Sequence, residues 1–229
     1  MYPLCRHHRY HRPLNPWVEA ARWVRGGLRK LAFELREAGV LSMLTSAGCS
    51  GRWYLLPLQV HNDSQITHHS TFADVEEVID VVMQSFARSA PRDHWLVIKH
   101  HPMDRAYRHY GRFIRERSRA LGVCERVLYV HDLHLPTLLK HTKGVVTVNS
   151  TTGLQALYHK VPVKTLGECF YDIEGLVHQG TLDDFWHAPA PVDVELYRRF
   201  REYLVRHTQL NASFYGRRGC PVFCVWGGF

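Results

Sequence analysis

The stretch Gly144–Tyr158 reads GVVTVNSTTGLQALY, and it decides the fold. Its first part, Gly144 to Val148, is an apolar run rich in β-branched residues, which predicts a buried strand. Residues 151–159 predict a helix, and the polar turn between the two contains hydroxyl side chains and a glycine. A strand that passes through a short polar turn into a helix is the repeating unit of α/β folds.

The same unit recurs on both sides of this stretch. Short apolar runs alternate with segments that have helical periodicity. The strands predicted from these runs are Trp53–Val60, Trp95–Lys99, Arg126–Val130, Gly144–Val148 and Val161–Leu166. The predicted helices are the apolar stripe Val75–Phe86, an Arg-rich segment 105–121, then 135–141, 151–159 and a closing helix Val194–His207. Together they predict an α/β fold with an open, mainly parallel, Rossmann-like sheet.

A basic segment precedes the sheet. Asn15 and Pro16 form a helix start, and apolar residues then recur at helical spacing up to Gly39. Residues 1–60 hold nine Lys and Arg against three acidic residues, so +6 of the formal +8 charge lies there. Such a helix either lies on an anionic membrane surface or packs its apolar face on its own domain, and the pattern leaves both open. Residues 39–52 read as a polar loop.

Composition narrows the class of protein. With 229 residues, 45% of them hydrophobic and 22% charged, the chain is long and apolar enough to bury a core. It has no apolar run of about 18 residues and no signal-peptide core, so we expect a soluble or peripheral cytoplasmic protein. The six cysteines are scattered and lack the spacing of a disulfide framework or a zinc site.

Polar residues follow four of the predicted strands at their carboxyl ends, where ligands bind in open α/β sheets. In chain order the candidates are Gln59, His61, Asn62 and Asp63; His100, His101 and Pro102; His131 and Asp132; and Asn149, Ser150, Thr151 and Thr152. We therefore expect one polar rim.

The rim residues suit a nucleotide phosphate. Hydroxyl groups and free backbone N–H groups in the turn Asn149–Gly153, at a helix start, can cradle a phosphate, although Ser and Thr also serve as plain helix caps. His100 and His101 add hydrogen-bonding or cationic groups, and Pro102 fixes the turn after them.

Two further interpretations concern single side chains. A metal site is the alternative for His100, His101, His131, Asp132 and His134, but adjacent histidines on an extended segment point to opposite faces, which disfavours it. Asp63 is either a catalytic base or the residue of an Asx turn.

Several motifs, in this order, carry a resemblance to a known family. They are Pro57-Leu58-Gln59 with His61-Asn62-Asp63-Ser64-Gln65, Lys99-His100-His101-Pro102-Met103-Asp104, Tyr129-Val130-His131-Asp132 with Leu135-Pro136, Val148-Asn149-Ser150-Thr151-Thr152-Gly153-Leu154, and Thr208-Gln209-Leu210-Asn211 with Ser213-Phe214-Tyr215. Over residues 53–215 the chain resembles the bacterial capsule polysaccharide biosynthesis and export family, which includes β-Kdo transferases of the capsule lipid linker.

The resemblance implies a GT-B type glycosyltransferase that uses CMP-Kdo, inverts the anomeric centre and needs no metal or other cofactor. Its acceptor would be a lipid of the phosphatidylglycerol type. His101, Pro102, Ser150 and Thr151 would hold the CMP phosphate and cytidine, with His100, His131, Asn149 and Thr152 beside them, and Asp63 is the candidate catalytic residue.

The resemblance also implies a domain plan. Residues 1–52 would be a basic helical remnant of the acceptor domain, residues 53–215 the CMP-sugar-binding domain, and residues 216–229 an unassigned tail, so that the chain is a shortened member. The expected partners are CMP-Kdo, an anionic lipid acceptor, the inner face of the inner membrane, and capsule assembly and export proteins. The alternative is a non-catalytic CMP-sugar-binding or assembly partner. Nucleic acid is not expected, because the basic segments lack a helix-turn-helix pattern and an aromatic strand platform.

Overall fold

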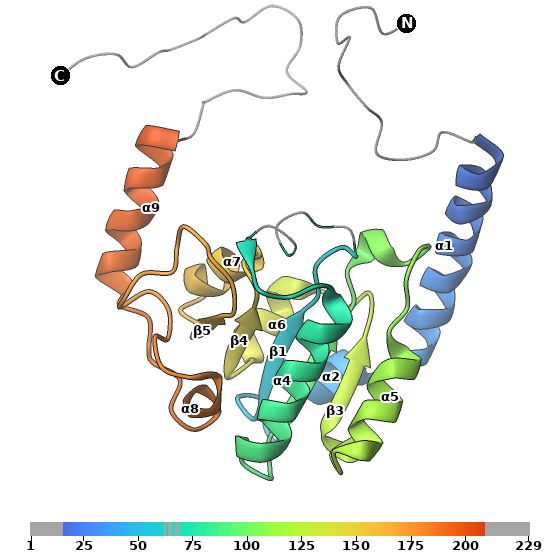
Figure 1. Cartoon of the computed structure of the whole chain (residues 1–229), viewed down its shortest axis with the longest axis horizontal. Helices are drawn as coiled ribbons and strands as arrows, with labels where there is room; N and C mark the ends of the chain where they lie inside the picture. The colour runs from blue at the N-terminus through green and yellow to red at the C-terminus, as the bar shows by residue number, and fades with distance from the viewer. Residues whose placement is uncertain (1–15, 62, 64–65, 67–68, 209–229) are drawn as a thin grey trace, which may run out of the picture. The chain divides into compact units, whose positions relative to one another are not determined.

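The structure, a computed structural model, describes residues 16–61, 63, 66 and 69–208 (Figure 1). These residues divide into two compact units, one that ends at Val192 and one that starts at Asp193. The first unit contains the sheet, and the second contains helix α9, Val194–Thr208. The predicted helix cap Asn15, the motif residues Asn62, Ser64 and Gln65 and those after Thr208, and the tail 216–229 lie outside the described residues.

A five-stranded parallel sheet forms the centre of the first unit. Each predicted strand is confirmed, with ends shortened by up to three residues. The strands are β1 Trp53–Pro57, β2 Trp95–Lys99, β3 Val127–Val130, β4 Gly144–Thr147 and β5 Val163–Thr165. The predicted α/β fold with a Rossmann-like parallel sheet is therefore confirmed.

The strand order β3-β2-β1-β4-β5 places β1 at the centre. Leu55 of β1 is paired with Val97 of β2 on one side and with Val145 of β4 on the other. Strands β2 and β3 thus extend the sheet on one side of β1, and β4 and β5 extend it on the other side. The boundary between the paired strands β1 and β4, where this direction changes, is the switch point at which open α/β sheets bind their ligands.

Helices cover both faces of this sheet (Figure 1). Helix α4 packs beside α5 and α8, and α6 packs beside α2 and α7. The helices of this unit are α1 Pro16–Arg36, α2 Val40–Thr45, α4 Val75–Ser89, α5 Gly111–Ala120, α6 Leu135–His141, α7 Thr152–Tyr158 and α8 Leu182–His187, with short 3-10 turns at Pro102–Asp104 and Cys124–Arg126.

The core lies between the sheet and helices α4 and α8. Tyr54 of β1 and Trp186 of α8 are fully buried, as is Phe86 of α4. The Tyr54 hydroxyl donates to the Trp186 carbonyl at 2.6 Å, and the Trp186 indole donates to Ser85 Oγ at 2.8 Å. Because each buried polar group has a partner, these large aromatic side chains are buried without unpaired donors.

Two predictions about the helical regions are wrong, and one helix was missed. Residues 39–52 are not one loop, since they contain α2, which buries Leu44 and accepts a hydrogen bond from the Trp53 indole at 3.1 Å. The helix predicted from 105 begins at Gly111, because the preceding residues form turns held by Asp104. Helix α8 was not predicted, although Thr181 and Asp184 form the capping box that starts it.

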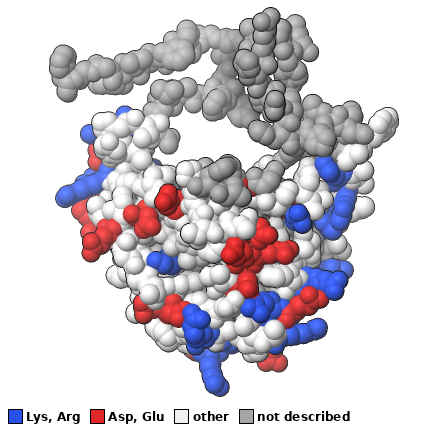
Figure 2. Space-filling model, in the orientation of Figure 1, with Lys and Arg blue, Asp and Glu red and all other residues white. Residues whose placement is uncertain are grey.

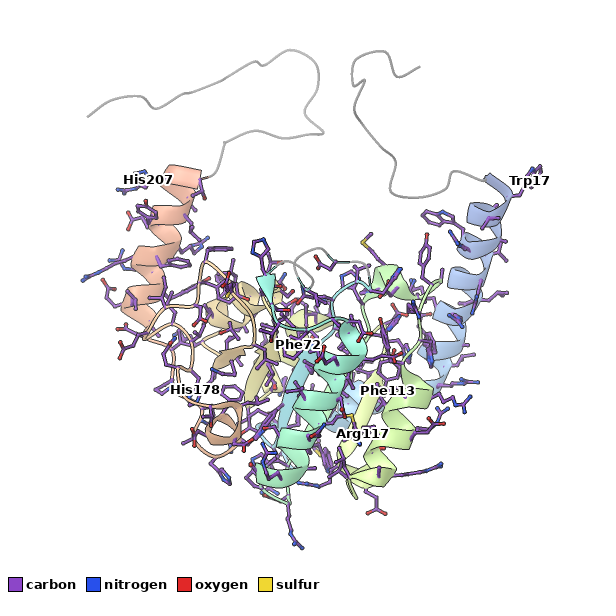
Figure 3. All side chains as sticks on the ribbon, in the orientation of Figure 1. Trp17, Phe72, Phe113, Arg117, His178 and His207 are labelled. Atoms are coloured by element: carbon purple, nitrogen blue, oxygen red, sulfur yellow. The ribbon has the colours of Figure 1, made fainter. Side chains whose placement is uncertain are left out.

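Helix α1 directs its apolar stripe away from the rest of this unit. The stripe consists of Trp17, Val24, Leu28, Leu31 and Leu35. Contacts with that unit come from the opposite face: Arg29 donates to the Arg105 carbonyl at 2.8 Å, and Phe33 is buried against His131. The stripe is exposed, with Trp17 at 84% and Leu35 at 80%, and Trp17 projects from the end of the helix in Figure 3. No helix among the described residues is long and apolar enough to cross a bilayer.

Candidate functional site

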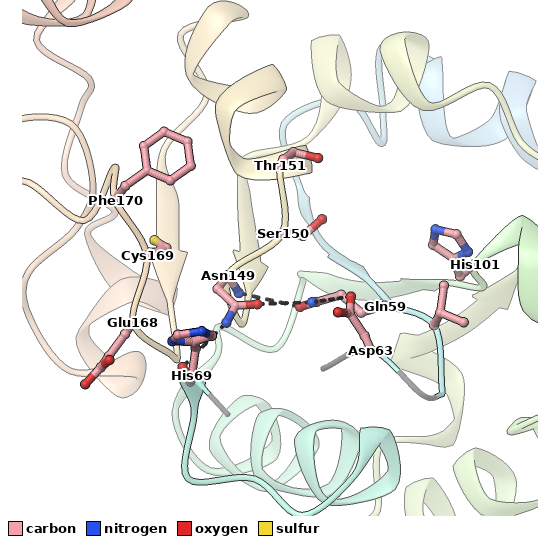
Figure 4. Close-up of a pocket in the computed structure, with 11 residues that line it drawn as sticks. Gln59, Asp63, His69, His101, Asn149, Ser150, Thr151, Glu168, Cys169 and Phe170 are labelled. Atoms are coloured by element: carbon pink, nitrogen blue, oxygen red, sulfur yellow. Dashed lines mark hydrogen bonds between the residues drawn. The ribbon is translucent and has the colours of Figure 1, made fainter. Parts of the chain in front are cut away.

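A cavity of about 790 Å³ opens at the carboxyl edge of the sheet, at the switch point between β1 and β4 (Figure 4). It is lined by residues that follow four different strands. These are Gln59, Val60 and Asp63 after β1, His101 after β2, Asn149, Ser150 and Thr151 after β4, and Glu168, Cys169 and Phe170 after β5, together with His69. The structure therefore brings together six of the candidates predicted at the strand ends: Gln59, Asp63, His101, Asn149, Ser150 and Thr151.

The turn between β4 and α7 is stabilised by its own side chains. Ser150 Oγ accepts the Thr152 N–H at 3.2 Å and contacts Thr152 Oγ1 at 3.2 Å, while the Ser150 carbonyl accepts the Gly153 N–H at 2.9 Å. These two N–H groups are therefore bonded within the turn. Asn149, Ser150 and Thr151 of this turn line the cavity. Thr152 does not line it, and its N–H and hydroxyl contact Ser150 Oγ instead.

Gly153 permits the close approach of a buried tyrosine behind this turn. The Tyr171 hydroxyl donates to the Ser150 carbonyl at 2.5 Å, and a Cβ at position 153 would overlap the Tyr171 ring and hydroxyl. Glycine is thus required here for space. Burial raises the pKa of Tyr171, so its hydroxyl stays protonated and remains a donor.

His101 lines the cavity as a neutral side chain. Its Nδ1 accepts the Met103 N–H at 3.2 Å, so the ring proton of the neutral form is on Nε2. Burial is the main cause that lowers the pKa of His101, and the nearby Asp104 opposes this effect. Pro102 begins the 3-10 turn that follows and does not line the cavity. His101 therefore offers a hydrogen-bond donor rather than a fixed charge.

His100 and His131 lie outside the cavity. His100 follows β2 as His101 does, but adjacent residues of an extended segment point to opposite faces. It is 2% exposed, its Nδ1 lies 2.7 Å from the Tyr129 hydroxyl oxygen, and burial lowers its pKa to about 3. His131 Nδ1 lies 2.5 Å from Glu37 Oε1, and its ring stacks on Phe33 at 3.5 Å between centroids. These two histidines contribute to the packing of the sheet edge and of α1.

Asp63 lines the cavity opposite the β4–α7 turn. Gln59 Nε2 donates to Asp63 Oδ2 at 3.0 Å and also to Asn149 Oδ1 at 3.1 Å (Figure 4). Below this loop the buried Asp104 carboxylate accepts the His61 N–H at 2.7 Å and contacts His61 Nδ1 at 2.5 Å. These bonds hold the loop that carries Asp63 at the end of β1.

Among the described residues, no Lys or Arg lines the cavity. Lys99, the last residue of β2, is buried and donates to the His131 carbonyl at 3.1 Å. The cavity instead combines amide, hydroxyl and imidazole donors with two carboxylates, Asp63 and Glu168. The neutral donors can bind a phosphate group, and the two carboxylates can accept hydrogen bonds from hydroxyl groups of a ligand.

Sequence reasoning placed Gln59 on the rim without a role and did not include Glu168, Cys169 and Phe170. The position of Gln59 directly after an apolar run was a signal for it. The segment after β5 gave no such signal, because its residues reach the cavity only through the fold of the loop that Asp172 and Tyr171 hold.

Comparisons with known proteins agree with one another. A model of the family described as "Capsule polysaccharide biosynthesis protein" matches residues 3–215. The chain is 48% identical over 208 residues to the capsule polysaccharide export protein KpsS of Escherichia coli, covering 91% of this chain and 53% of that protein. It is 41% identical over 212 residues to the capsule polysaccharide modification protein LipB of Neisseria meningitidis, covering 91% of this chain and 50% of LipB.

The chain therefore spans about half the length of the curated relatives it matches. Among solved structures, KpsC of Thermosulfurimonas dismutans, a β-Kdo 2,7 transferase, aligns with 80% of this chain and 67% of its own, with 14% identity and a TM-score of 0.43.

Proposed function

Since this chain belongs to the capsule polysaccharide biosynthesis protein family, we propose that it is the nucleotide-binding half of a GT-B type glycosyltransferase. In this proposal it moves Kdo from CMP-Kdo to a lipid acceptor with inversion. The names of KpsS and LipB support a role in capsule export or modification. The sugar, the nucleotide and the acceptor come from the family resemblance of the motifs in residues 53–215.

One observation carries the proposal: the cavity at the switch point has neutral donors and no lysine or arginine among its described residues. A CMP-sugar carries a single phosphate, whereas a nucleoside diphosphate sugar carries two and gains more from cationic partners. Ser150, Thr151 and His101 would donate to that phosphate, with Asn149 beside them. Donors fixed in this way stabilise the charge that develops on the departing CMP.

Asp63 would serve as the base. In an inverting transfer, the acceptor hydroxyl oxygen forms a bond to the anomeric carbon of Kdo while the bond from that carbon to the phosphate oxygen breaks. The electron pair of the broken bond leaves with CMP, and the hydroxyl proton goes to the Asp63 carboxylate. Asp63 supports this role by its position on the cavity wall that faces the β4–α7 turn.

The nucleotide site is tested by calorimetric titration of CMP into the wild-type chain and a Ser150→Ala, His101→Ala double variant. We expect the double variant to bind at least about tenfold more weakly, because two donors to an anion are lost. A matched control, His207→Ala with Thr208→Ala, removes similar groups from the last turn of α9. Equal CMP affinity in the double variant and the wild type would rule out the site.

A second candidate function is a non-catalytic CMP-sugar-binding partner in the capsule assembly and export machinery. It rests on the same cavity, whose lining would bind the CMP-sugar whether or not transfer follows. Two measurements separate these functions. In the first, the chain is incubated with CMP-Kdo and a phosphatidylglycerol acceptor, and product is measured. In the second, the melting temperature is measured with and without CMP. Product formation that is lost in Asp63→Ala supports the transferase. A CMP-dependent rise in melting temperature without product supports the binding partner.

We also propose a peripheral position at the cytoplasmic face of the inner membrane. It is supported by α1, whose exposed apolar stripe is flanked by the exposed basic residues Arg25, Lys30 and Arg36. Figure 2 has Lys and Arg side chains along the edge where α1 lies. Each basic residue near an anionic surface contributes about 1 kcal/mol to binding.

A further inference from the structure

Gln59 occupies a central position in the candidate site that the proposed chemistry does not use. It follows the central strand β1, is 7% exposed, and its amide extends toward the end of β4. Its Nε2 lies 3.0 Å from Asp63 Oδ2 and 3.1 Å from Asn149 Oδ1, and its Oε1 lies 3.5 Å from the Asn149 backbone nitrogen. One buried amide therefore contacts both the candidate base and the nucleotide side of the cavity (Figure 4).

The chemistry of the three groups fixes how they are oriented. An ionised carboxylate only accepts hydrogen bonds, so the Gln59 amino group must face Asp63. The second hydrogen of that amino group is then directed to Asn149, whose oxygen must face it. The amino group of Asn149 consequently points the other way, where Nδ2 lies 3.5 Å from the His69 carbonyl. Gln59 thus couples the Asp63 carboxylate to the orientation of the Asn149 amide.

We propose that Gln59 is a positioning residue that holds the Asp63 carboxylate and the Asn149 amide in one fixed relation. The role rests on the proposed function, in which Asp63 is the base and Asn149 borders the nucleotide. Gln59 neither accepts the proton nor donates a hydrogen bond to the phosphate. It sets the orientation of Asp63, which would accept the proton, and of Asn149, which would border the nucleotide. The Gln59 amide is buried, and a buried N–H group without an acceptor is unfavourable. The orientation of this amide is therefore stable only while Asp63 and Asn149 both remain in place.

The test is Gln59→Met, which keeps the length of the side chain and removes the amide. We expect CMP affinity to fall about threefold to tenfold and kcat for transfer to fall about tenfold, with the KM for the acceptor unchanged. Gln84→Met is the matched control, because Gln84 Nε2 donates to Asp80 Oδ2 at 2.9 Å on α4, away from the cavity. The control should bind CMP and transfer Kdo as the wild type does.

Double-mutant cycles separate positioning from simple packing. If Gln59 acts through Asn149, the pair Gln59→Met, Asn149→Ala binds CMP no more weakly than Asn149→Ala alone. If it acts through Asp63, adding Gln59→Met to Asp63→Ala lowers kcat no further. Additive losses in both cycles, or wild-type behaviour of Gln59→Met, would overturn the proposal.

A spectroscopic measurement keeps the inference testable when Gln59→Met does not fold or the wild-type chain transfers nothing. Asp63→Ala leaves Gln59 in place, and the side-chain amide signal of Asn149 in a ¹⁵N spectrum reports its orientation. We expect that signal to move in Asp63→Ala and to stay in place in Asp80→Ala. An Asn149 signal that stays in place in Asp63→Ala contradicts the positioning role. If the signal moves but the wild-type chain does not bind CMP, Gln59 still couples Asp63 to Asn149, and only the proposed function is contradicted.

Discussion

His100 and His101 are neighbours in the chain and have opposite surroundings. His101 lines the cavity and accepts the Met103 N–H through Nδ1, while His100 is enclosed by aromatic side chains with its Nδ1 against the Tyr129 hydroxyl. Burial makes the charged form of His100 unfavourable and lowers its pKa from 6.5 to about 3. A histidine in such a place must accept a proton when the protein unfolds at acidic pH.

This difference makes stability depend on pH. The folded state binds fewer protons than the unfolded state below pH 6.5, so stability is present above that pH and is lost as the pH falls toward 3. Between pH 7 and pH 5 His100 accounts for a loss of about 2 kcal/mol in the free energy of unfolding. We expect His100→Asn to lose less on that interval in urea titrations. A loss as large as that of the wild type would contradict this assignment, and His187→Asn serves as the surface control.

Gly153 gives a prediction that concerns space alone. Gly153→Ala would bring a methyl group against Tyr171 and should cost about 1 to 3 kcal/mol in unfolding free energy. Because Tyr171 donates to the Ser150 carbonyl, CMP affinity should fall as well. The added variant Tyr171→Phe reduces the bulk and should restore part of the stability. Gly27→Ala is the control, since a Cβ there meets nothing within 4 Å. Wild-type stability in Gly153→Ala would show that the turn can shift.

At the level of single residues, the sequence predicted cavity residues in the segments that follow strands β1, β2 and β4. Asp63, His101, Asn149, Ser150 and Thr151 reach the cavity because strand ends of a parallel sheet meet at one edge. Consecutive residues after a strand, such as His100 and His101, point to opposite sides. Which of the two faces the cavity depends on the residue at which the strand ends. Glu168 and Phe170 depend on loop packing, which no local pattern encodes.

Among the elements, α1 is the one whose orientation differs most from that of an ordinary surface helix. The face opposite its apolar stripe contacts the rest of the sheet unit through Arg22, Arg29 and Phe33, and the stripe is exposed. Exposed apolar stripes with basic flanks are found where helices bind anionic membranes.

The stripe is tested by flotation with vesicles of phosphatidylglycerol and of phosphatidylcholine. We expect binding to phosphatidylglycerol vesicles, a several-fold decrease in Leu28→Asp, Leu31→Asp, and a decrease with added salt. Val81→Asp with Tyr158→Asp introduces the same charge at exposed apolar positions of α4 and α7. Flotation that is equal on both vesicles, or unchanged in the Leu28 and Leu31 variant, would show that the stripe has another partner. A dimer of the wild type by light scattering would identify that partner as a second copy.

The elements differ in how far sequence predicted them. The strands and helix α6 follow from apolar runs and from proline at a helix start, and they are where periodicity placed them. Helix α2 escaped prediction because serine, threonine and glycine dominate residues 39–52, and its stability comes from burial of Leu44 rather than from local preference. The late start of α5 reflects tertiary contacts, since Asp104 and the Arg105–Asp132 ion pair hold the preceding residues in turns.

For the whole molecule, charge is distributed unevenly along the sequence. Residues 1–60 carry +6 of the formal charge of +8, whereas the cavity at the switch point has no Lys or Arg among its described residues. The strand order, which places β1 and β4 side by side, is what brings Gln59, His101 and Ser150 to one cavity.

The most direct test of this account is a crystal structure of the chain soaked with CMP. We expect the CMP phosphate within hydrogen-bond distance of Ser150, Thr151 and His101 Nε2, inside the cavity between the ends of β1 and β4. CMP bound at another place on the molecule, or no CMP density at a concentration that saturates the protein in calorimetry, would contradict it.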